Sequence, residues 1–94
     1  FEVKLRQADA ALASAREAVA QRRAAVFVAD SAVRLAEAQL AQARLDDTRA
    51  SRLSARDAAP AERVEKVHTA LAAAEAQLDS AHRAVEQARA VLGI

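Results

Sequence analysis

Large aliphatic residues recur at every seventh position along the first half of the chain. They are Leu5, Leu12, Val19, Val26, Val33 and Leu40. Alanine stands three positions after each of them, except that Arg22 follows Val19. This is a heptad repeat with a large residue at position a and alanine at position d, a pattern typical of helices in coiled coils. Its seven-residue period predicts a left-handed supercoil.

The repeat is interrupted once, around Pro60, the only proline of the chain. The a position after Leu40 holds Asp47. Beyond the proline, large residues again recur every seven positions, followed after three positions by a small or β-branched residue. This second repeat comprises Val64, Val67, Leu71, Ala74, Leu78, Ala81, Val85, Ala88 and Leu92. Two heptad segments with one interruption predict two helices that pack on each other.

The interruption favours a chain that folds back on itself. Proline lacks a backbone N–H and suits the first turn of a helix, not its interior. Asp57 precedes it and can act as a cap or turn residue. We therefore expect an all-α fold, an antiparallel two-helix coiled-coil hairpin. Its helices should lie at about 1–55 and 60–93, with the tip at about 56–59.

The repeats permit several registers, and we prefer the one in which the numbers of facing residues add up to 114. Leu40 then faces Ala74, and the other layers likewise pair a large residue with a small one. Such layers let the helix axes approach closely with little void. Asp47 falls opposite Val67 in this register. We therefore expect the seam, the line of a and d positions along which the two helices pack, to loosen near the tip.

An alternative register, in which the facing numbers add up to 100, balances the two arms. The fragment would then be a whole hairpin. However, this register buries Arg22 against Leu78 and leaves Pro60 inside a helix. A charged side chain on the seam and a proline in a helix interior are both unfavourable.

In the preferred register, residues 1–19 have no partner in the chain, because Ile94 ends level with Ala20. Their seam is nevertheless apolar. Either the second helix continues past Gly93 and Ile94 in a longer parent protein, or another chain covers the seam. The pattern is already running at Phe1, so we interpret the chain as a fragment of a longer protein. The first helix should be ~80 Å long at ~1.5 Å per residue.

The composition argues against several classes of function. The chain has no cysteine, one glycine and two aromatic residues, and its net charge is +1 with acids and bases interspersed. Such a charge gives no strong attraction to nucleic acid, and no apolar run approaches the length of a membrane span. A glycine-rich phosphate loop and a nucleophile motif are both missing. We expect neither an enzyme nor a cofactor, and no nucleic-acid partner.

The histidines give no metal site. His68 and His82 both occupy e positions, ~21 Å apart along a helix, which is too far for one metal ion. We expect both to be solvated surface residues. Arg63, with glutamates beside it, should likewise form weak solvated pairs on the helix face.

Some apolar residues fall off the seam, among them Phe27, Val28 and Leu35 at b and c positions. One interpretation is ordinary surface exposure, which is common. The other is a lateral stripe on which hairpins pack side by side, since Val28 and Leu35 are one heptad apart on one face.

Three parts of the chain carry a family resemblance. They are FEVKLRQADAALASA, then AEAQLAQARLDDTRASRL with PAERVEKVHTALAAAEAQL, and finally AVEQARAVLG. Together they resemble the α-helical hairpin of periplasmic adaptor proteins, also called membrane fusion proteins of the HlyD type. The tip motif of that family resembles Arg, three residues, Leu, six residues and Ser. Here Arg49, Leu53 and Pro60 stand at these positions, and SARDAA replaces the family's glycine-containing turn.

The resemblance implies that the tip docks onto a TolC-like outer-membrane channel. Arg49, Leu53 and Pro60 would make the contacts, with Arg52 and Arg56 at the rim. It also implies an inner-membrane transporter as a partner of domains outside this chain, in multidrug efflux or type I secretion. The protein would be a periplasmic homo-oligomer whose parent is anchored to the inner membrane. The alternative is a generic structural coiled coil, a spacer or dimerisation rod without a channel partner.

Overall fold

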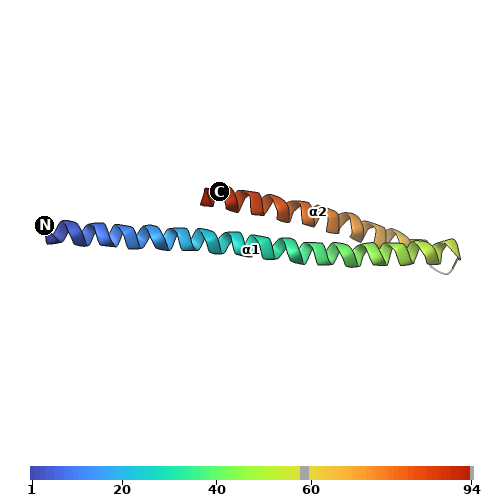
Figure 1. Cartoon of the computed structure of the whole chain (residues 1–94). Helices are drawn as coiled ribbons and strands as arrows, with labels where there is room; N and C mark the ends of the chain where they lie inside the picture. The colour runs from blue at the N-terminus through green and yellow to red at the C-terminus, as the bar shows by residue number, and fades with distance from the viewer. Residues whose placement is uncertain (58–59, 94) are drawn as a thin grey trace.

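The computed structural model describes residues 1–57 and 60–93, and these form two long helices that pack antiparallel (Figure 1). Helix α1 spans Glu2–Ala55 and helix α2 spans Ala61–Leu92. The molecule measures 84 × 18 × 14 Å and is therefore a rod. The predicted all-α helical hairpin is confirmed. Of the expected tip at 56–59, residues 58 and 59 lie outside the described residues.

The heptad residues of both helices meet along one seam. Every a and d residue of the second repeat is buried or half-buried in α2. The residues of α1 that share the seam are Val26, Ala29, Val33, Ala36, Leu40, Ala43, Asp47 and Ala50. Since a helix alone gains little from these positions, their burial between the helices is what stabilises the hairpin.

The best-buried part of the seam shows its register. One cluster comprises Ala29, Val33, Ala36, Leu78, Ala81 and Val85. In the preferred register these residues form facing pairs, each with one large residue and one alanine. In the alternative register Val33 would face Val67, which is not in the cluster. The packing therefore agrees with the register in which the numbers of facing residues add up to 114.

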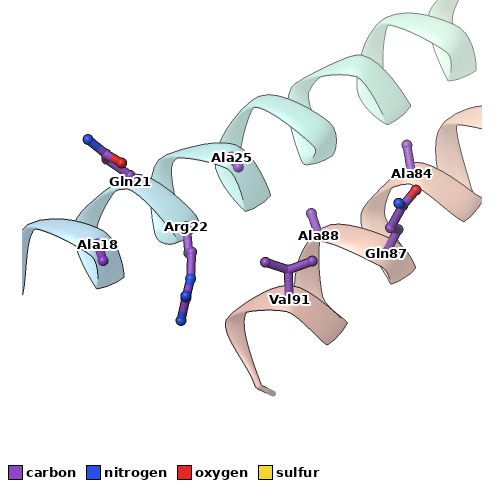
Figure 2. A pocket seen from close by; sticks show the side chains of 8 residues that line it. All are labelled: Ala18, Gln21, Arg22, Ala25, Ala84, Gln87, Ala88 and Val91. Atoms are coloured by element: carbon purple, nitrogen blue, oxygen red, sulfur yellow. The ribbon is translucent and has the colours of Figure 1, made fainter. Parts of the chain in front are cut away.

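The seam ends where α2 ends. Gly93 adopts a left-handed conformation with φ of 94°, and its N–H donates to the Arg89 carbonyl at 2.9 Å, which caps α2 after Leu92. A left-handed glycine is a common way to stop a helix. At this level Arg22 of α1 is exposed and points toward the last turn of α2, near Val91 (Figure 2).

The first turns of α1 extend beyond the C-terminal end of α2 (Figure 1). Their seam residues are open to solvent: Leu5 is 54 % exposed and Leu12 is 51 % exposed. No described residue of α2 covers them. The expectation that residues 1–19 lack a partner within the chain agrees with this geometry.

A first prediction concerns the small residues of the seam. Ala36 is only 2 % exposed and packs in the layer of Leu78. Ala36→Leu forces the helices apart, so we expect the free energy of unfolding to fall by about 1–3 kcal/mol. Ala38→Leu makes the same change on the exposed face of α1 and should alter it by less than about 0.5 kcal/mol. Thermal unfolding followed by circular dichroism measures both, and equal effects would contradict the seam.

Candidate functional site at the hairpin tip

Backbone hydrogen bonds close the last turn of α1 just before the chain reverses direction. The Arg56 N–H donates to the Leu53 carbonyl at 3.1 Å, and the Asp57 N–H donates to the Ser54 carbonyl at 2.9 Å. Asp57 has a φ of 55°, in the left-handed region. Aspartate reaches this region more readily than most residues other than glycine, because its short polar side chain can bond locally. Asp57 thus holds the place that a glycine commonly takes after a helix.

Pro60 precedes α2 instead of forming its first turn. Its backbone is extended, with φ of −66° and ψ of 146°, and it occupies the N-cap position. Its carbonyl accepts hydrogen bonds from the N–H groups of Arg63 at 3.1 Å and Val64 at 3.3 Å. The expected start of the second helix at residue 60 is therefore one residue early. A proline side chain offers no oxygen to the free N–H groups of α2, whereas a serine would.

Arg49 and Leu53 lie one helical turn apart and line the same groove. This groove of about 310 Å³ runs between the helices near the tip. Its lining residues are Asp46, Arg49, Ala50, Leu53, Arg63 and Val67. Ala50 is buried and forms the floor, whereas Leu53 is 39 % exposed at the edge. The structure thus places the two predicted contact residues together, with charge and apolar surface side by side.

Pro60 lines a second groove, which adjoins the first. Its volume is about 490 Å³, and Arg63 and Val67 line both grooves. The three predicted contact residues are therefore arranged around Arg63. Arg52 and Arg56 are exposed and line neither groove.

Arg63 is the tip residue whose position the sequence reasoning missed. We expected it to form weak solvated pairs with neighbouring glutamates, yet it connects the two grooves. A signal for this exists in the heptads. Arg63 and Leu53 both occupy g positions, which flank one side of an antiparallel seam. In the register in which the numbers of facing residues add up to 114, these two positions come together at the tip.

Asp47 interrupts the seam and is accommodated by an ion pair or hydrogen bond across the helices. Its Oδ1 lies 3.1 Å from Nδ1 of His68. The side chain of Asp47 is 22 % exposed, and that of His68 is 75 % exposed. A mostly buried carboxylate needs a polar partner, and the histidine at the neighbouring e position supplies one. His68 is thus exposed, as expected, but it is not free of contacts.

The remaining candidate residues are distributed away from the tip. Phe27, Val28 and Leu35 are exposed in the middle of α1, and a role in lateral packing stays a prediction. Within residues 1–57 and 60–93, no group of His, Asp or Glu is arranged to hold a metal ion. Neither α1 nor α2 is apolar enough over a sufficient length to cross a membrane.

Comparison with known proteins gave no relative. No family model, curated protein or solved structure matches the chain.

The left-handed residue at the end of α1 generates a second prediction. Asp57→Gly should raise the free energy of unfolding by about 0.5–1 kcal/mol, because glycine adopts positive φ without steric cost. Asp57→Val should lower it by about 1 kcal/mol or more, since a β-branched residue is strained at this φ. Denaturant unfolding of the two variants measures both changes. A valine variant as stable as the wild type would contradict the turn geometry.

A third prediction concerns the seam at Asp47. Asp47→Leu puts an apolar side chain opposite Val67 and completes the repeat, so we expect the free energy of unfolding to rise by about 1–2 kcal/mol. His68→Ala removes the same contact without adding apolar surface, and should change it by less than about 1 kcal/mol. Urea unfolding distinguishes the two variants. A leucine variant less stable than the alanine variant would mean that the polar contact outweighs apolar burial here.

Proposed function

We propose that this chain is the α-helical hairpin of a periplasmic adaptor, and that its tip docks onto a TolC-like outer-membrane channel. The observation that carries the proposal is the juxtaposition of Arg49 and Leu53 on one open groove at the far end of the rod. These are the two positions at which the sequence resembles the family's docking motif. The resemblance and the hairpin support the proposal together.

The chemistry of the groove suits a helical partner. A guanidinium offers five N–H donors in a planar fork, which can bind carboxylates or the free carbonyls at a helix end. Arg49 and Arg63 supply two such groups beside the apolar edge of Leu53. Leu53 offers a knob for a hydrophobic hole on the partner, while the exposed Arg52 and Arg56 can steer the approach.

The wider arrangement follows from the same proposal. A rod 84 Å long carries the tip far from its other end, where domains outside this chain would meet an inner-membrane transporter. The parent would be a periplasmic homo-oligomer anchored in the inner membrane. In such an assembly neighbouring hairpins would contact each other through Phe27, Val28 and Leu35.

The docking proposal gives a fourth prediction. The chain is immobilised, and its binding to a purified TolC-like channel in detergent is measured by surface plasmon resonance. Arg49→Asp and Leu53→Ser should each weaken binding at least about tenfold. Replacing a residue at the centre of an interface lowers the binding free energy by about 1–3 kcal/mol. Circular dichroism should show unchanged helicity, since both residues are exposed.

Matched variants serve as controls. Arg34→Asp and Leu45→Ser make the same chemical changes at exposed positions away from the groove, and should leave binding unchanged. If tip and control variants bind alike, the tip has no docking role. A wild-type chain that binds no channel would instead favour the structural spacer.

A further inference from the structure

The N-terminal part of α1 presents an apolar seam that α2 does not cover. Phe1, Leu5, Leu12 and Val19 are all exposed, although they follow the same heptad spacing as the buried seam residues. In the rest of α1 the same positions are buried by a second helix. The seam is therefore built to take an antiparallel helix, and its flanking charges indicate which one.

Charges beside the seam follow a rule that the hairpin itself demonstrates. In an antiparallel pair the e positions of the two helices face each other. Asp30 of α1 and Arg89 of α2 both occupy e positions, and Oδ1 of Asp30 lies 3.6 Å from Nη2 of Arg89. A partner helix for the N-terminal seam should therefore present opposite charges at its e positions.

The e positions of the uncovered seam divide by sign. Glu2 and Asp9 come first, and Arg16 and Arg23 follow one and two heptads later. A helix of the same sequence running in the opposite direction brings bases beside acids. This charge complementarity singles out a second copy of the same segment among possible partners.

We propose that two copies of this chain associate through residues 1–23, antiparallel, with facing residue numbers that add up to 20. Leu5 then faces Ala15 of the second copy, and Leu12 faces Ala8 of the second copy. Each of these layers pairs a large residue with alanine, as in the seam of the hairpin. Phe1 faces Val19 at the two ends of the contact.

Charge complementarity is complete only in this register. Glu2 comes beside Arg23 of the second copy, and Asp9 comes beside Arg16 of the second copy, with both pairs repeated by the two-fold symmetry. A shift of one heptad in one direction places Asp9 beside Asp9, and a shift in the other direction places Arg16 beside Arg16. The latter shift also sets Arg22 against Leu5 on the seam.

The surface of α1 offers a matching depression. It has a volume of about 600 Å³ and is lined by Ala15, Arg16, Val19, Ala20 and Arg23. In the proposed pairing, Phe1 and Leu5 of the second copy enter this depression. Glu2 and Asp9 of the second copy then reach Arg23 and Arg16 on its rim.

Sedimentation equilibrium of the whole chain, over a concentration series, tests the proposal and is the fifth prediction. The wild type should approach twice the 10.0 kDa mass of one chain. Asp9→Arg or Arg16→Asp alone should weaken the dimer at least about tenfold, because symmetry converts two attractions into two repulsions. The double variant, D9R with R16D, should restore it, and so should an equimolar mixture of the two single variants.

Controls with the same charge changes lie off the seam. Glu17→Arg and Arg6→Asp should leave the dimer intact, because positions f and b point away from a partner. Circular dichroism reports folding independently, since the hairpin seam lies beyond the altered residues. A monomeric wild type, a dimer that survives D9R, or a double variant that fails to restore dimerisation would each overturn the proposal. Antiparallel pairing at this end directs the two tips away from each other, so the dimer is a separate association from the docking at the tip, and the variants at Arg49 and Leu53 test that docking independently.

Discussion

The whole structure depends on the packing of large residues against alanine along one seam. The chain has only two aromatic residues, so no single side chain buries a large area. What it has is repetition, since each layer of the buried cluster sets one leucine or valine against one alanine. Small residues let the helix axes approach, and close approach lets the large residues fill the space that remains. The helices are therefore held by many small, equivalent contacts.

The register of this seam also determines where the tip falls. Once large residues must face alanines, the chain has to reverse near Asp57, and the backbone there adopts the required positive φ. Arg49 and Leu53 then stand in the last turns of α1, opposite the first turn of α2, and Arg63 completes their surroundings. The candidate docking surface is thus a consequence of packing tens of ångströms away, and it needs no special motif to position it.

Much of the fold was predictable, because a heptad repeat indicates both that a segment is helical and which face of the helix is buried. The two helices and the register of the cluster around Val33 and Ala81 follow from residue spacing alone. The contacts of polar residues do not. The spacing sets His68 level with Asp47, but the contact between their side chains depends on side-chain rotamers, which the spacing does not determine. Proline is compatible with both the N-cap position and the first turn of a helix. The sequence therefore did not determine which of these two neighbouring positions Pro60 occupies.

The two flanks of the seam differ, and this difference connects the packing with the candidate functions. The flank of e positions carries the polar contacts that join α1 to α2. Asp30 and Arg89 both occupy e positions, and His68 at an e position contacts Asp47 at an a position. The grooves between the helices instead open on the flank of g positions. The g residues that line them are Ala18, Ala25, Gln39, Asp46, Leu53, Arg63, Ala70, Ala84 and Val91.

Short side chains explain why that flank is open. Alanine at four of these nine g positions leaves space beside the seam, whereas long charged side chains cover the other side. At the tip the g positions hold Leu53 and Arg63, so that the open flank ends in a surface with both apolar and charged groups. A partner that binds the tip would therefore approach from the g flank, whereas the e flank holds the two helices together.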